Sequence, residues 1–187
     1  MTGVTSELSK ALSSVVSGAG DVAQTTQKVA KDTIVQTVKS GGDVAKTAMS
    51  TAGEIVSEGI TITSKSGTAA TGAVTGLVTG VIEGVKDVGG DVGGTATQAA
   101  RGAVKSVDSI GGDVGEAAVS AVTGSINAAG TIGGDTGELA KAAVMGTLQA
   151  ADEIGSEAGG IVRKALLNAA ALPHDVIDSL LKGDKPK

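Results

Sequence analysis

The stretch GGDVGG, residues 89–94, places four glycines within six residues. Both flanks have helical patterns: GLVTGVIEGVKDV precedes it and TATQAARGAVKSV follows it. Each glycine in a helix interior costs about 1 kcal/mol relative to alanine. The stretch therefore either ends one helix and starts another, or forms a bare surface where a second helix backbone comes close. The choice between these two possibilities decides the architecture.

The same motif recurs along the chain. GGDVG, GGDTG and GSEAG follow one another at a fixed interval of twenty-two positions, and GGDVA and AGDVA occur upstream with the same interval. The longest interval between neighbouring motifs is forty-eight positions, which is two repeats plus four. Internal repetition at a fixed period is typical of repeat architectures. The motifs begin at residues 19, 41, 89, 111, 133 and 155.

Twenty-two is twice eleven, and eleven residues make three helical turns. One apolar face can be followed at this period through the glycines at 111 and 112 without loss of phase. The pattern predicts an all-α fold of long glycine-zipper helices with 22-residue (2 x 11) repeats, closely packed in a bundle or a higher assembly. The residues of this face are Val92, Ala96, Ala99, Ala103, Val107, Ile110, Val114, Ala118 and Ala121.

Two other architectures stay open. A left-handed glycine could end each helix and the following aspartate could cap the next, which would give short helices broken at the GG motifs and stacked as an α-solenoid. A period of eleven and a four-residue insertion favour the continuous helices instead. A β-solenoid fits the period and the strand-like ITITSKSG, but ELAKAAVMGTLQAADEI is rich in helix formers with helical spacing.

Glycines at every fourth position predict faces where helix backbones touch. GAVTGLVTGVIEG carries four such glycines in register, near the four-residue insertion, and each repeat motif adds another pair. Small residues at this spacing allow close helix–helix approach. The predicted helix-packing interface consists of Gly72, Gly76, Gly80, Gly84, Gly89, Gly93, Gly111, Gly115, Gly133, Gly137, Gly155 and Gly159.

The composition limits the classes of protein. The 187 residues include 30 glycines but no aromatic residue and no cysteine, so a core must be built from small aliphatic side chains without disulfides. The net charge of −5 is scattered, which argues against a nucleic-acid partner. The start lacks a basic n-region and a long apolar core, so no secretory signal is predicted. A cytoplasmic location is the default, and an extracellular or membrane-associated one stays open.

No catalytic or cofactor site is predicted. The only histidine, His174, precedes Asp175 and is expected to be solvated at a helix start after Pro173. The recurring aspartates are expected to be capping or solvated residues, because one repeat along a continuous helix separates them too widely to share one ion. GGDVGG also lacks the Lys-Ser/Thr pair of a phosphate-binding loop. These observations predict a protein that is not an enzyme and has no metal or cofactor.

The unit GGDVGEAAVSAVTGSINAAGTI, residues 111–132, resembles the glycine-rich hendecad helical repeats in its period. It is more distantly similar to the eleven-residue repeats of synucleins, perilipins and apolipoproteins. That resemblance implies amphipathic helices, either packed together or lying on lipid. The lipid-binding families carry a lysine-rich polar face, whereas lysines are sparse here. Protein–protein packing is therefore favoured over a lipid surface.

Three regions are expected: an N-terminal lead-in helix over residues 1–18, a glycine-rich repeat region over 19–170, and a C-terminal cap and tail over 171–187. The predicted function is that of a non-enzymatic structural protein that self-assembles through glycine-lined helix faces into a homo-oligomeric bundle, tube or filament. The partner is thus a second copy of the chain. The alternatives are a membrane-active or lipid-surface amphipathic helical protein and, less favoured, a protective protein that folds on drying.

Overall fold

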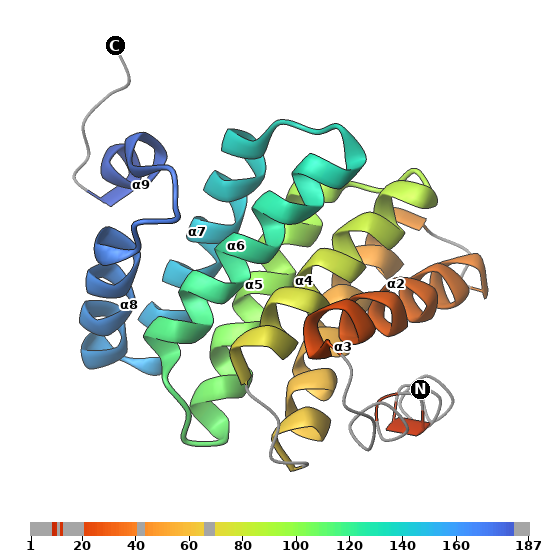
Figure 1. Ribbon diagram of the computed structural model, residues 1–187, viewed down its shortest axis with the longest axis horizontal. Helices are drawn as coiled ribbons and strands as arrows, with labels where there is room; N and C mark the ends of the chain where they lie inside the picture. Colours follow the sequence, from red (N-terminus) through yellow and green to blue (C-terminus); the bar gives the residue numbers. More distant parts are fainter. Residues whose placement is uncertain (1–8, 11, 13–20, 41–43, 66–69, 182–187) are drawn as a thin grey trace.

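The computed structural model describes residues 9–10, 12, 21–40, 44–65 and 70–181 (Figure 1). These residues are almost entirely helical and include no strand, which confirms the all-α prediction and excludes the β-solenoid for them. The predicted lead-in helix over residues 1–18 lies outside the described residues, except for residues 9, 10 and 12. The helices are α2 (Val22–Ser40), α3 (Val44–Lys65), α4 (Ala70–Asp87), α5 (Val92–Ser109), α6 (Val114–Ile132), α7 (Thr136–Ile154), α8 (Ser156–Asn168) and α9 (His174–Leu181).

The GG motifs end helices. Gly89, Gly111 and Gly133 have φ angles of 73°, 72° and 67°, in the left-handed region that side chains other than glycine rarely adopt. At the first of these turns, the amide of Gly90 donates to the carbonyl of Val85 at 2.9 Å. The amide of Gly89 donates to the carbonyl of Lys86 at 3.0 Å. This pair of bonds defines the Schellman ending of a helix. The prediction of helices continuous through these motifs is therefore wrong.

The second glycine and the aspartate have distinct roles at the turn between α5 and α6. A methyl group placed on Gly112 would lie 2.7 Å from Cγ1 of Val107 in the last turns of α5, so a side chain there would require Val107 to shift. Asp113 then caps α6, because its Oδ1 accepts hydrogen bonds from the amides of Gly115 at 2.8 Å and Glu116 at 3.0 Å. The aspartate caps were foreseen with the broken-helix alternative.

The four-residue insertion lengthens one helix. The helix α3 has 22 residues, whereas α4 and α5 have 18 each. Four residues make about one helical turn, which matches the difference in length between α3 and its neighbours α4 and α5. The prediction that placed the insertion near the glycine-rich stretch of α4 is corrected.

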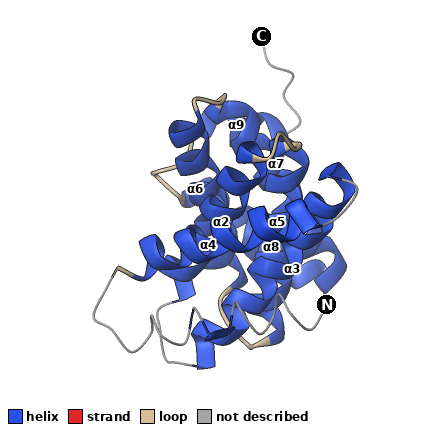
Figure 2. Cartoon of the chain, turned by 90° about the vertical axis from the view of Figure 1, so that its right-hand side faces the viewer, coloured by secondary structure: helices blue, strands red, loops and turns tan. Residues whose placement is uncertain are grey.

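The helices lie in two rows (Figures 1 and 2). Each of α2 to α5 packs more extensively on the next helix but one than on the next helix, as α2 does on α4 and α5 on α7. One row holds α2, α4 and α6, and the other holds α3, α5 and α7. Because the chain reverses at every turn, helices within one row run parallel. The shortened α8 packs on α6 and α7, and α9 packs on α7 and α8.

Small aliphatic side chains fill the space between the rows. The predicted apolar face is buried within each helix, as Ala99, Ala103 and Ala121 are fully buried. The face does not continue across the turn, because Ile110 is 41% exposed where α5 ends. In the C-terminal region, Ile177 of α9 is fully buried. The tail beyond residue 181 lies outside the described residues.

Candidate functional site

The glycine-rich stretch of α4 faces α2 within the same chain. A methyl group on Gly76 or Gly80 would collide with the backbone carbonyls of Ala23 and Gln27, respectively. A methyl group on Gly84 would collide with the side chain of Ile34. These three predicted positions thus allow α4 to approach α2 closely.

Gly72 lies at the margin of this contact. A methyl group on Gly72 would lie 4.0 Å from the amide nitrogen of Ala23 and from Cβ of Val22, which is ordinary van der Waals contact. This glycine therefore faces α2, but the contact between α4 and α2 does not require a glycine there.

A second set of glycines repeats the same contact in the following helices. A methyl group on Gly102 would lie 2.8 Å from the carbonyl oxygen of Gly53, and one on Gly124 would lie 2.7 Å from that of Thr75. A methyl group on Gly146 would lie even closer to the carbonyl oxygen of Thr97. Together with Gly80, these glycines recur with the period of the repeat. The set is called the seam column and consists of Gly80, Gly102, Gly124 and Gly146.

Gly102, Gly124 and Gly146 were visible in the sequence as a repeated glycine but were not assigned to the interface, whereas Gly80 was. The carbonyl partners of these three, Gly53, Thr75 and Thr97, follow one another with the same period, and each partner precedes its glycine by forty-nine positions. Gln27 precedes Gly80 by fifty-three positions, because the extra turn of α3 lies between them. The four parallel contacts α2–α4, α3–α5, α4–α6 and α5–α7 therefore share one geometry.

Hydroxyl groups tie the parallel helices together beside the seam column. Thr79 donates to the carbonyl of Gly124 at 2.9 Å, and Thr97 donates to that of Ala142 at 3.1 Å. Thr75 and Ser57 make longer bonds of the same kind, to Ser120 at 3.3 Å and to Gly102 at 3.4 Å. Donor and acceptor have the same separation along the sequence in every case, so the hydroxyls fix the same register in three successive contacts.

The helix-packing prediction is corrected for the first glycine of each motif. Gly89, Gly111, Gly133 and Gly155 have φ values between 67° and 145°, and a methyl group on any of them would meet nothing within 4 Å. They lie in turns, where the backbone conformation requires glycine. No second helix approaches them among the described residues.

The glycines four positions later lie in the first turn of each helix. A methyl group on Gly93 or Gly159 would meet only an aspartate oxygen, at 3.5 and 3.6 Å. A methyl group on Gly137 would lie 3.3 Å from Oδ1 of Asp135 and 3.9 Å from Cγ2 of Val176 in α9. Gly115 alone among the four is crowded by another helix, because a methyl group there would lie 2.9 Å from Cβ of Ala165 in α8.

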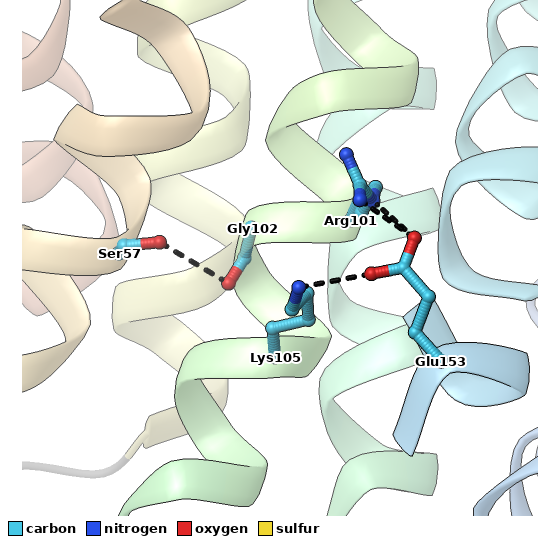
Figure 3. A network of polar contacts seen from close by, with 5 residues as sticks. All are labelled: Ser57, Arg101, Gly102, Lys105 and Glu153. Atoms are coloured by element: carbon cyan, nitrogen blue, oxygen red, sulfur yellow. Dashed lines mark hydrogen bonds and ion pairs between the residues drawn. The ribbon is translucent and has the colours of Figure 1, made fainter. Parts of the chain in front are cut away.

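An ion-pair network joins α5 to α7 on the outer surface (Figure 3). Glu153 accepts hydrogen bonds from Arg101 at 2.6 and 3.0 Å and from Lys105 at 2.9 Å. These two partners hold the pKa of the Glu153 carboxyl below its ordinary value, with Lys105 the larger contributor. The two cations also border an open groove of about 320 Å³ between α3 and α5, with Glu54 and Gln98 among its other lining residues.

A second network lies between α2 and α4. Glu83 is 4% exposed and accepts a hydrogen bond from Gln27 at 2.9 Å. Lys31 lies 3.0 Å from Asp87 and 3.9 Å from Glu83. The hydrogen bond to Asp87 raises the pKa of Lys31 despite the opposing effect of partial burial. The Glu153 network links two helices of one row, and the Glu83 network links two helices of the other. Each thereby reinforces a parallel contact.

Among the described residues, the outer edge of α7 is covered only by the short helix α9, with Val176 beside Gly137. The positions of α7 that correspond to Thr97, Arg101 and Lys105 of α5 lie two repeats further on. They are Lys141, Met145 and Gln149, and all three are exposed.

No group of three or more His, Asp or Glu side chains among the described residues could hold a metal ion. His174 is exposed at the start of α9. Within the same residues, every helix is too short or too polar to cross a bilayer. Comparison with protein-family models, with characterised proteins and with solved structures gave no match.

Proposed function

We propose that this chain is a non-enzymatic structural protein, an α-solenoid of 22-residue helical repeats that associates with further copies of itself. In solenoids, each repeat contacts only its neighbours and the array has two ends. The seam column is the observation that carries this proposal. Four successive parallel contacts use one backbone-to-backbone geometry, so each added helix presents an edge to which another helix can be added.

Support for self-association comes from the unequal ends of this array. The outer edge of α7 carries the short helix α9, but Lys141, Met145 and Gln149 are exposed there at the positions where α5 carries α7. An edge that fits a different surface of a second copy makes a heterologous contact, which propagates when it does not close into a ring. The glycine-lined faces predicted between molecules are already occupied within the chain for Gly76, Gly80 and Gly84. The intermolecular contact is therefore proposed at the ends of the array.

The non-enzymatic part of the proposal rests on the chemistry of the side chains. The chain has one histidine and no cysteine. The two most connected charged clusters, around Glu153 and Glu83, are engaged in ion pairs between helices. Such pairs stabilise helix register and are the ordinary role of charged side chains on packed helices.

Light scattering coupled to gel filtration tests self-association. For a chain of 17.8 kDa, the mass is expected to rise with protein concentration above that of the monomer. Negatively stained micrographs of the same fractions are expected to show particles elongated along one axis. A mass that stays at the monomer value from micromolar to the highest soluble concentration would remove the self-association proposal and leave a monomeric solenoid.

The lipid-surface alternative stays a prediction, and the same preparation tests it. Cosedimentation with neutral and with anionic vesicles measures binding directly. Because the apolar side chains of the described helices are largely used in the core, we expect the protein to remain in the supernatant with both vesicles. Sedimentation with either vesicle, accompanied by a gain in helicity, would favour the lipid function.

A further inference from the structure

The groove between α3 and α5 lies where one position of the repeat lacks its side chain. Thr75 of α4 donates its hydroxyl to the carbonyl of Ser120 in α6. Thr97, one repeat later, donates in the same way to the carbonyl of Ala142 in α7. One repeat before Thr75 the residue is Gly53, which lines the groove and has no hydroxyl to donate. The α3–α5 contact therefore lacks a side chain that the next two parallel contacts have.

The missing side chain leaves both space and a hydrogen-bond acceptor. Gln98 stands to Gly53 as Ala142 stands to Thr97 along the sequence. A methyl group on Gly53 would lie 3.3 Å from the carbonyl oxygen of Gln98, and both residues line the groove. The volume of about 320 Å³ is in the range of small-molecule sites. A small ligand could thus occupy the place of the absent threonine and donate to this carbonyl.

The two walls of the groove carry charges of opposite sign. Arg101 and Lys105 line it from α5, with side chains 34% and 48% exposed, and Glu54 lines it from α3. Glu153 accepts from Nε and Nη2 of Arg101 and from Nζ of Lys105. The third guanidinium nitrogen of Arg101 points away from Glu153 (Figure 3). Donors for a ligand carboxylate and an acceptor for a ligand ammonium therefore border one groove.

We infer that this groove binds a small zwitterion of the free amino acid type. The ligand carboxylate accepts from Arg101 and Lys105, and the ligand ammonium donates to Glu54 and to the carbonyl of Gln98. A simple anion fits less well, because Glu54 and Glu153 balance the two cations. The groove is open and its charges are partly exposed, so the binding is weak. This function is separate from self-association, since the groove lies within one chain.

Amide chemical shifts of the full-length protein test the binding. Addition of L-alanine at constant ionic strength is expected to give saturable shifts at Gly53, Ser57, Gln98 and Gly102, with a Kd of about 1–10 mM. Propionate and ethylammonium each carry one of the two charged groups of L-alanine, and each is expected to bind about tenfold more weakly or less. Propionate that binds as well as L-alanine would overturn the zwitterion. The absence of saturable shifts at these amides would overturn the site.

Filling the groove is the first variant. In Gly53→Thr, the new hydroxyl is expected to donate to Gln98 as that of Thr97 does to Ala142, and L-alanine is expected to lose its saturable shifts. The control is Val119→Thr, which introduces the same residue at the equivalent position of α6 and is expected to bind as the wild type does. Binding that survives Gly53→Thr, or that both variants lose, would overturn the site.

Removing the acidic partner is the second variant and does not depend on how Gly53→Thr folds. Glu54→Gln changes an exposed side chain, and circular dichroism checks that the helices are intact. It is expected to weaken the binding of L-alanine about tenfold and to leave the binding of propionate no weaker, because only the ammonium loses a partner. Unchanged binding of L-alanine to Glu54→Gln would overturn the assigned orientation.

Discussion

Glycine has two separable roles in this chain, and the residue-level geometry distinguishes them. At Gly111 the positive φ is the requirement, because space for a side chain is available but the conformation is not. At Gly146 the conformation is helical, and the carbonyl of Thr97 leaves no space for a side chain. A third group, to which Gly130 belongs, is helical and has nothing within 4 Å.

These groups predict opposite effects of the same substitution. Gly146→Ala is expected to lower the free energy of unfolding by roughly 1–3 kcal/mol, because the added methyl group collides with backbone rather than with a flexible side chain. Gly130→Ala is the matched control and is expected to raise it by up to about 1 kcal/mol through helix propensity. Urea unfolding measures both. Equal effects of the two substitutions would contradict a backbone contact at Gly146.

The sequence predicted the glycine positions but could not assign their roles. The spacing of the GGD motif is the same in both architectures. It therefore cannot show whether a helix ends at the motif or continues through it. The deciding quantity is the φ angle of Gly89 and its equivalents, which is set by the return of the chain onto the neighbouring helix. The pairing of Gly102 with Gly53 depends on a contact between helices far apart in the sequence, which a pattern along the chain does not reveal.

At the scale of helices, parallel neighbours are held by backbone proximity, by hydroxyl bonds and by ion pairs at the margins. The α5–α7 contact has all three: Gly146 on Thr97, the Thr97 hydroxyl on Ala142, and Glu153 between Arg101 and Lys105. The hydroxyls were present in the sequence as scattered threonines. Their function became apparent only when the two-row arrangement placed each beside a carbonyl of the next helix but one.

The ion pairs predict a pH dependence at this contact. A carboxyl whose pKa is lowered on folding stabilises the fold above its unfolded pKa, and that contribution is lost as the pH falls through the folded value. Glu153 lies in this class, with an ordinary value of 4.5. Glu153→Gln is therefore expected to destabilise the protein slightly at pH 7 and to have less effect at pH 3, as measured by urea unfolding.

The control for this pH effect removes the two cations. In a background with Arg101→Met and Lys105→Met, Glu153→Gln is expected to have the same effect at both pH values. A pH-dependent difference that persists without the cations would assign the effect to another carboxyl group.

At the scale of the whole molecule, the two rows explain why a chain without aromatic residues can form a core. The helices pack on neighbours in their own row and in the other row, and most of the buried apolar side chains are alanine or valine. Backbone proximity within a row replaces the bulk that aromatic residues usually supply. The all-α class was predictable from composition and period. The number and direction of the helices were not, because they depend on where the chain turns.

The seam column is the central claim, and nuclear Overhauser effects between α-protons test it most directly. Methyl groups placed on Gly102, Gly124 and Gly146 would lie 3.1 to 3.3 Å from Cα of the carbonyl partner in the preceding helix of the row, so the α-protons of each pair must be close. Cross-peaks are therefore predicted for Gly102 with Gly53, Gly124 with Thr75 and Gly146 with Thr97. Their absence, with helical amide cross-peaks running unbroken through Gly111 and Gly112, would contradict the fold and favour long continuous helices.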